Sequence, residues 1–155
     1  LVVDFDHLDS TASVDYKRYE DDGQTVKKHN QMTVDIPPFA RDVLSAFYYI
    51  RTQELYVGDP IQLTSHEKDS VYNLEVKIYK REVIEVEAGK FTCLKIEPLL
   101  KGEGIFKQKG RLLIWLTDDE LKIPVQMKSK VIVGSITSEL MEIQGVNRPI
   151  PARVH

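Results

Sequence analysis

Alternating apolar and polar residues in the second half of the chain constrain its fold more than any other feature. Across residues 71–78 every second residue is apolar, and the apolar members are Tyr72, Leu74, Val76 and Ile78. A period of two is typical of a β-strand with one buried face. Residues 61–67 predict a preceding strand that turns at 68–70, and residues 82–100 predict a hairpin that turns at Gly89 and Lys90.

In the next run, residues 110–117, the five residues from Leu112 to Leu116 are apolar at consecutive rather than alternate positions. This pattern predicts a central strand that is covered on both faces. Asp118 and Asp119 predict a turn, because aspartate is favoured in turns. Residues 121–130 then predict another strand, whose shared apolar face is Ile123, Val125 and Met127.

The two ends of the chain also favour β-structure. Residues 12–36 predict a hairpin, in which Asp22 and Gly23 supply the tight turn. Residues 134–145 are interpreted as a last strand, and a helix is the alternative because their periodicity is mixed.

One segment, residues 42–52, predicts a short helix among the strands. Asp42 is a suitable N-cap, and an apolar face follows at helical spacing, formed by Val43, Ala46, Phe47 and Ile50. Leu44 and Tyr48 are expected to widen that face. The predicted fold is therefore mainly β, an antiparallel meander that forms a curved open barrel or sandwich-like sheet with one short α-helix packed as a lid.

Length and composition predict one β-rich domain over residues 1–155, with 42% hydrophobic and 29% charged residues. A net charge of −3 argues against nucleic acid as a partner. The apolar runs are far shorter than the ~20 residues of a transmembrane helix. The chain opens on "LVVDFDHL" without an initiator Met, so we expect it to be part of a longer precursor that has further N-terminal strands.

Catalytic signatures are missing from the sequence, and neither a metal site nor a cofactor is predicted. Asp4, Asp6 and Asp9 cluster near His7 but lack the glycine and the later glutamate of a calcium loop. Carboxylates in residues 117–120 could perform acid–base chemistry, although a turn is the favoured interpretation. The single cysteine, Cys93, is expected to be a small half-buried hydrophobe, and His29 and His66 are expected at solvated or edge positions.

Aromatic residues on the predicted helix and on the doubly apolar strand allow two interpretations. They fill a core between helix and sheet, or they line an apolar cavity for a hydrophobic ligand. Arg51 at the helix end complements the helix dipole or meets an anionic headgroup. The candidate ligand-binding residues are Phe47, Tyr48, Arg51 and Trp115.

Two motifs resemble a family of exported bacterial proteins known as domain of unknown function 3108. The first, in residues 35–52, matches at Asp42, Leu44, Ser45, Ala46, Tyr48, Tyr49 and Arg51. The second, in residues 89–140, matches at Trp115, Leu116, Thr117, Asp118, Asp119, Pro124 and Val125. The resemblance implies a periplasmic or outer-envelope location, a layout similar to lipoprotein-carrier folds, and no known catalytic residues.

Three classes of function follow from these observations. The first expectation is a non-enzymatic envelope protein that binds or carries a hydrophobic or lipid-like molecule. The second is a structural or protein-interaction component of the envelope, with an envelope protein as partner. The third is an enzyme that acts on an envelope polymer.

Overall fold

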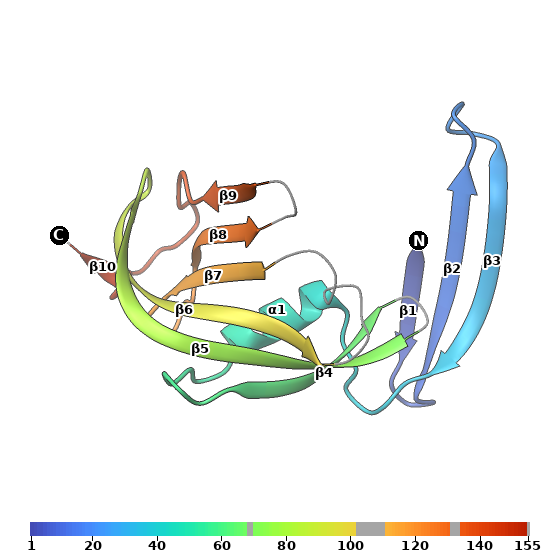
Figure 1. Ribbon diagram of the computed structural model, residues 1–155, viewed down its shortest axis with the longest axis horizontal. Helices are drawn as coiled ribbons and strands as arrows, with labels where there is room; N and C mark the ends of the chain where they lie inside the picture. Colours follow the sequence, from blue (N-terminus) through green and yellow to red (C-terminus); the bar gives the residue numbers. More distant parts are fainter. Residues whose placement is uncertain (68–69, 102–110, 131–133, 155) are drawn as a thin grey trace.

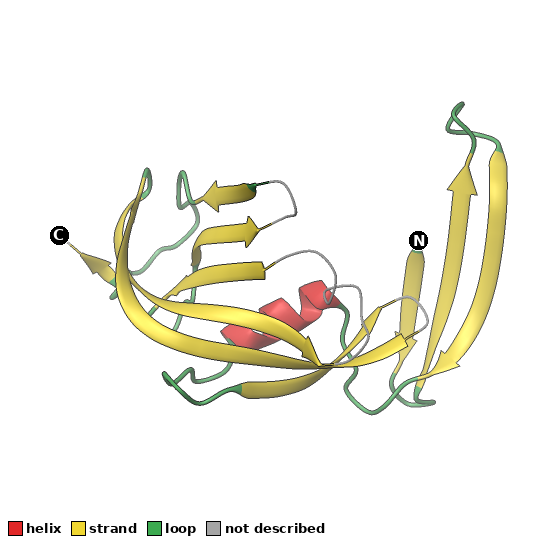
Figure 2. Ribbon diagram, in the orientation of Figure 1, coloured by secondary structure: helices red, strands yellow, loops and turns green. Residues whose placement is uncertain are grey.

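A computed structural model describes residues 1–67, 70–101, 111–130 and 134–154 as two antiparallel sheets and one helix (Figure 1, Figure 2). The smaller sheet has the order β1-β2-β3, formed by Val2–Asp6, Thr11–Tyr19 and Val26–Asp35. The larger, seven-stranded sheet has the order β4-β5-β6-β7-β8-β9, and β10 pairs with β6. Its strands are Ile61–Glu67, Ser70–Val86, Gly89–Lys101, Arg111–Thr117, Pro124–Lys130, Ser135–Glu139 and Arg153–Val154. The predicted mainly-β, antiparallel fold with one short helix is confirmed, and the curved sheet stays open rather than closing into a barrel.

The helix α1 spans Val43–Arg51 and begins where predicted. The Asp42 carboxylate caps it by accepting from the amides of Leu44 at 2.8 Å and Ser45 at 2.9 Å. Ala46 and Ile50 are buried against the large sheet. The expectation that Tyr48 widens the buried face is wrong, because Tyr48 is 57% exposed. Leu44 is 64% exposed but lies at the edge of that face, where it borders the space beneath the helix. A helix of nine residues that packs on one side only leaves its other faces in solvent.

The long hairpin of β5 and β6 lies between β4 and β7 in the larger sheet. The alternating run 71–78 and the first arm of the predicted hairpin form one continuous strand, β5. A bulge interrupts its pairing, since Ile78 lies opposite Ile96 while Lys80 lies opposite Lys95. The turn falls at residues 87–88, and Gly89, with φ of 130°, already begins β6. The turn predicted at 68–70 includes residues 68–69, which lie outside the described residues.

Strand β7 confirms the prediction of a doubly covered central strand. Ile114 and Leu116 belong to the cluster beneath α1, whereas Leu113 and Trp115 belong to a second cluster on the opposite face. The prediction for β8 is wrong at one position, because Val125 packs in the second cluster and Met127 packs in the first. The physical reason is a register shift between β7 and β8, where Trp115 pairs with Gln126 but Leu116 pairs with Pro124.

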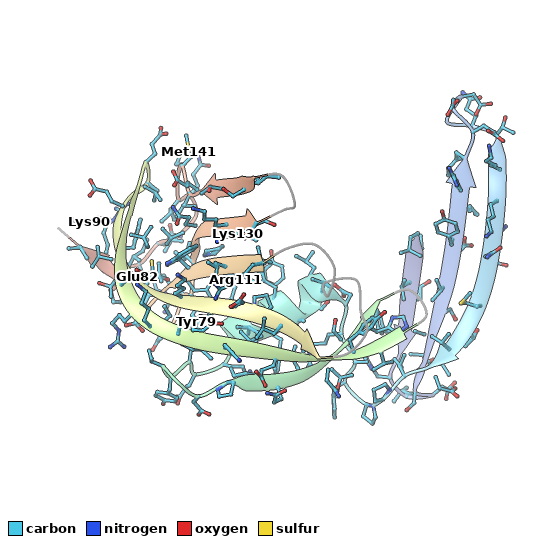
Figure 3. The ribbon with its side chains drawn as sticks, viewed as in Figure 1. Tyr79, Glu82, Lys90, Arg111, Lys130 and Met141 are labelled. Atoms are coloured by element: carbon cyan, nitrogen blue, oxygen red, sulfur yellow. The ribbon has the colours of Figure 1, made fainter. Side chains whose placement is uncertain are left out.

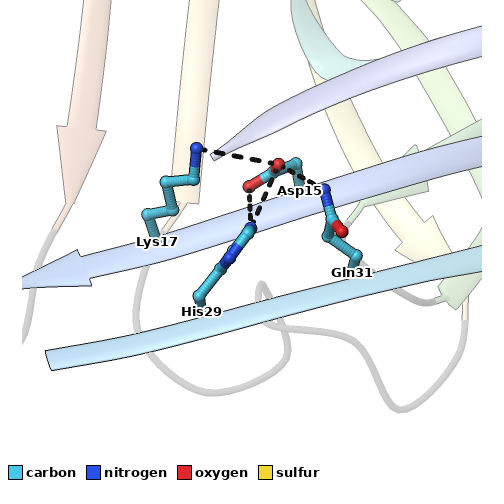
Figure 4. A network of polar contacts seen from close by, with 4 residues as sticks. All are labelled: Asp15, Lys17, His29 and Gln31. Carbon is cyan, nitrogen blue, oxygen red and sulfur yellow. Dashed lines mark hydrogen bonds and ion pairs between the residues drawn. The ribbon is translucent and has the colours of Figure 1, made fainter. Parts of the chain in front are cut away.

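The predicted hairpin of residues 12–36 is present as β2 and β3, and Figure 1 shows it extending away from the larger sheet. Gly23 takes a φ of 68° in the turn, as its place in the sequence predicts. Asp15 accepts a 2.9 Å hydrogen bond from Gln31 and lies 3.1 Å from the His29 ring (Figure 4). These two hydrogen bonds, Gln31 first, hold the pKa of Asp15 below its usual range.

Two further sequence expectations are settled by the edge strands. Residues 135–139 form the strand β9, so the strand interpretation is correct over these residues and the helix is not. His66 lies on the edge strand β4, but its side chain is buried, with its ring centroid 5.5 Å from that of Phe5. Within the described part of the chain, α1 is too short and no other helix is long and apolar enough to cross a membrane.

Candidate functional site

An apolar cavity of about 370 Å³ lies between α1 and the larger sheet. The helix contributes one wall through Phe47, Ala46 and Ile50. The sheet contributes the other through residues of four successive strands, Val76, Ile96, Ile114 and Met127. Among the described residues that line it, Ser65 is the one polar residue, and it is buried.

Local sequence patterns explain how this cavity forms. Residues three and four apart on α1 project from one side of the helix, so Ala46, Phe47 and Ile50 face the sheet together. On β5, Leu74 and Val76 are two residues apart and therefore share the face below the helix. The side chains of the two walls do not fill the space between them, although protein interiors are normally packed with few voids larger than a water molecule.

The cavity reaches the surface at the first turn of α1. Val43 and Leu44 line the cavity and are also 50% and 64% exposed. Phe39, just before the helix, is 72% exposed and has a φ of 62°, a left-handed conformation that is unfavourable for a bulky residue. The Arg41 guanidinium donates to the Phe39 carbonyl at 2.8 Å and stabilises this conformation. We call Val43 and Leu44 the apolar rim.

The predicted ligand-binding residues on the helix lie close together but have different surroundings. Phe47 lines the cavity, and its ring centroid is 6.0 Å from that of Tyr48. Tyr48 points outward, and the Arg51 guanidinium lies 5.5 Å from its ring centroid. Arg51 donates through Nε to the carbonyl of Lys122 at 2.9 Å and through Nη2 to that of Leu121 at 3.1 Å. Its guanidinium therefore holds the turn between β7 and β8 rather than projecting into the cavity.

The fourth predicted residue, Trp115, lies on the opposite face of the sheet. It packs with Phe91 and Cys93 in the second cluster, and its Nε1 donates to Glu82 at 2.8 Å. Burial opposes ionisation of Glu82, but hydrogen bonds from Lys80 and Trp115 outweigh it and hold the pKa of Glu82 below its usual range. The structure therefore brings Phe47, Tyr48 and Arg51 together and keeps Trp115 apart from them.

The strand residues that line the cavity were not among the predicted site residues. Val76, Ile96 and Ile114 carry a sequence signal, because their alternation marks a buried face. Alternation indicates that a strand face is buried, but it does not show whether that face packs against other side chains or borders a cavity.

The carboxylates of residues 117–120 hold a turn, as the favoured interpretation expected. Asp119 Oδ1 accepts from the Thr117 hydroxyl at 2.8 Å and from the amides of Leu121 and Lys122 at 3.0 and 3.2 Å. Its Oδ2 accepts from the amide of Ala152 at 3.1 Å, which joins the C-terminal tail to this turn. Asp118 forms an ion pair with Arg81. These contacts give both carboxylates a structural role.

The other chemical candidates have equally local roles. Asp6 accepts from the amides of Leu8 and Asp9 at 2.9 and 3.0 Å and so closes a tight turn. Among the described residues, no three His, Cys, Asp or Glu side chains are grouped to hold a metal ion. Cys93 is fully buried, and burial, with a smaller contribution from nearby carboxylates, raises its pKa to about 12. A thiol in this state is a poor nucleophile.

A second and more polar cavity, of about 580 Å³, lies beside the C-terminal tail. Its lining includes Glu87, Met141, Arg148 and Arg153. Arg153 is already engaged, since its Nη2 donates to the carbonyl of Ala88 at 2.6 Å. The mixed charges of this lining make it a less specific site than the apolar cavity.

Comparison with known proteins gives a match to a protein family. The model of the family described as "Protein of unknown function (DUF3108)" matches residues 1–141. Neither a curated protein nor a solved structure matches the chain.

Proposed function

Because the chain belongs to this DUF3108 family, whose description names no activity, we propose a function from the cavity itself. The protein binds an extended apolar molecule, such as the acyl chain of a lipid, between α1 and the larger sheet. The observation that carries this proposal is an unfilled volume of about 370 Å³ whose lining, over the part of the chain that the structure describes, is apolar except for Ser65.

The size and chemistry of the cavity suit such a ligand. Ligand pockets in proteins measure roughly 300–1,000 Å³ and are lined mainly by hydrophobic side chains with a few polar groups. An empty apolar cavity costs stability, because its lining loses contacts. A bound apolar chain would restore those contacts, and the exposed Val43 and Leu44 give it a route to the surface.

The place of action is part of the same proposal. The resemblance to exported bacterial proteins favours the periplasm or the outer envelope, where a carrier would shield acyl chains from water. The competing function is a structural or interaction component of the envelope, and the exposed Phe39 and Leu44 support it as a contact surface.

Native mass spectrometry on the protein purified from its own host, followed by solvent extraction, separates the two functions. Binding of an apolar molecule predicts a bound mass of lipid size that extraction removes. A mass equal to that of the chain alone would favour the interaction component instead.

A cavity-filling variant gives an independent test of where the ligand binds. Ala46→Leu places a larger side chain in the cavity wall, so it should weaken uptake of a fluorescent fatty acid by about tenfold or more. Val83→Phe is the control, because Val83 is half exposed and does not line the cavity. Equal uptake by the wild type and Ala46→Leu would contradict binding at this site.

A further inference from the structure

The face of β5–β8 opposite α1 carries a group of cations that the cavity does not explain. Residues paired across neighbouring strands project from the same face, and the pairing places six basic side chains on the face that carries Leu113 and Trp115. They are Lys77, Lys80, Lys95, Arg111, Lys128 and Lys130. Figure 3 labels Arg111 and Lys130 on this part of the sheet, with Tyr79 and Glu82 near them. We call these six residues the cationic face.

Two pairs of these cations lie directly opposite each other on neighbouring strands. Lys80 pairs with Lys95 across β5 and β6, and Arg111 pairs with Lys130 across β7 and β8. Like charges at directly opposed positions of a sheet destabilise it. The bulge at Tyr79 creates the first pair, because it turns Lys80 onto the face that Lys95 occupies.

Carboxylates neutralise one member of each pair. Glu82 lies 2.7 Å from Lys80, and Glu97 receives hydrogen bonds of 2.6 and 2.9 Å from Arg111. Lys95 lies 5.1 Å from the centroid of the Trp115 ring rather than on a carboxylate. Within the part of the chain that the structure describes, no carboxylate lies within ion-pair distance of Lys95, Lys128 or Lys130.

Burial makes the outer layer of this face positive. The Glu97 side chain is 4% exposed, whereas the Arg111 side chain that covers it is 50% exposed. Glu75 is buried in the same way beside the exposed Lys77, at 3.7 Å. An approaching molecule therefore meets mainly ammonium and guanidinium groups, together with the Glu82 carboxylate, which is 28% exposed and bound to Lys80 and Trp115. The chain as a whole has a net charge of −3.

The layout of the cations favours an extended ligand over a small ion. Lys95 and Arg111 lie four residues apart in register, a distance of about 13 Å along the strands. None of the six lines either of the two cavities. A single small anion would reach one opposed pair, whereas a polymer with repeated charges would reach both.

We propose that the cationic face binds a linear acidic polymer that bears repeated carboxylate or phosphate groups. The ligand supplies a counter-charge to Lys95 and Lys130, the members of the two pairs that no described carboxylate contacts, so binding energy and fold stability are linked at this surface. The proposal concerns the face opposite α1 and holds whether or not the apolar cavity takes a lipid.

The test uses the full chain, with polygalacturonate as the carboxylate polymer and long-chain polyphosphate as the phosphate polymer. Isothermal titration calorimetry should show binding to at least one, weakening as salt rises because surface charges are screened. The relative affinities identify which anion is preferred. Absence of binding to both polymers at low salt would overturn the proposal.

A double variant, Lys95→Gln with Lys130→Gln, tests the face itself. It should weaken polymer binding about tenfold or more and leave the melting temperature unchanged or raised, since it removes both like-charge contacts. The matched control is Arg18→Gln with Lys28→Gln. Arg18 and Lys28 are likewise cations at opposed positions, here opposed to each other, and they lie on the β2–β3 hairpin away from the cationic face.

The control should keep the wild-type affinity. Equal losses in both double variants would show that net charge alone governs binding. Tighter binding to duplex DNA than to either polymer, or binding to anionic phospholipid vesicles alone, would overturn the assignment of the ligand class.

Discussion

The guanidinium Nε of Arg51 lies 2.9 Å from the carbonyl oxygen of Lys122, a residue 71 positions further along the chain. This hydrogen bond joins the last residue of α1 to the turn between β7 and β8. It also joins the two motifs by which the chain resembles its family, and it fixes the C-terminal end of the helix over the sheet. The exposed apolar rim lies at the other end of the helix.

Replacing Arg51 with lysine should lower the free energy of unfolding by about 1–3 kcal/mol, because hydrogen bonds from charged groups contribute on this scale. A lysine cannot reproduce the two-pronged geometry that reaches the carbonyls of Leu121 and Lys122. Urea denaturation measures the change. Arg148→Lys is the control, since its 3.5 Å ion pair with Glu120 is exposed and should contribute little. Similar losses in both variants would argue against an anchoring role for Arg51.

Truncating Phe47 to alanine should cost clearly less than the ~3–5 kcal/mol of a filled core position. Phe47 is only partly buried and lines the cavity. Phe91→Ala is the matched variant, because Phe91 is fully buried in the second cluster and should show the full cost.

The same pair of variants separates binding from stability. Phe47→Ala should weaken uptake of the fluorescent fatty acid, whereas Phe91→Ala should leave uptake unchanged under conditions in which it stays folded. A full core cost at Phe47 with unchanged uptake would favour α1 as a plain core element.

Stability should depend on pH through Glu97. Burial opposes its ionisation, but hydrogen bonds from Arg111 and Tyr79 hold its pKa below the ordinary value of 4.5. A lowered folded-state pKa adds stability above pH 4.5, and this contribution is lost as the pH falls through the folded-state value. Glu97→Gln should therefore destabilise the protein by about 1–3 kcal/mol at pH 7.

The difference between the wild type and Glu97→Gln should shrink as the pH approaches 3, measured by urea denaturation at several pH values. A difference that stays constant from pH 7 to pH 3 would mean that shape rather than charge determines the contribution of Glu97.

Phe39→Asn should raise the free energy of unfolding by about 0.5–1 kcal/mol, because it relieves a left-handed backbone strain whose cost is about 1–3 kcal/mol. Asparagine tolerates a φ of 62°, and the exposed Phe39 ring loses little packing. Leu8→Asn is the control, since Leu8 is exposed and lacks a positive φ. A drop in stability would show that the Phe39 ring makes a contact that offsets its strain.

The fold was largely predictable because local rules determine most of it. Strict alternation at Leu74 and Val76 identified β5, and a run of apolar residues identified β7 as doubly covered. The N-cap at Asp42 placed the helix start correctly. Strand β1 was not predicted. Its aspartates, Asp4 and Asp6, were considered as metal ligands, whereas the structure shows that they alternate with Val3 and Phe5, which form the buried side of a strand.

The errors arose where tertiary geometry overrides the sequence period. A bulge moves Val125 to the face opposite Met127. Its neighbour Pro124 is a residue that strands accept mainly at edges, first positions and bulges, but it does not specify the face on which the next side chain lies. Trp115 lies on a strand that is apolar on both sides, so the sequence does not indicate which face of the sheet its side chain occupies. The walls of the cavity follow from side-chain shapes across α1 and four strands, which no local pattern specifies.

The hairpin of β5 and β6 determines which parts of the molecule unfold together. Val76 and Ile96 hold the cluster beneath α1, while Ile84 and Phe91 belong to the cluster on the other face, and all four lie on these two strands. Neither cluster can unfold without breaking the backbone hydrogen bonds between β5 and β6 that support the other cluster. Amide hydrogens along β5 and β6 should therefore exchange last and together, whereas those at the far end of the β2–β3 hairpin, outside both clusters, should exchange first.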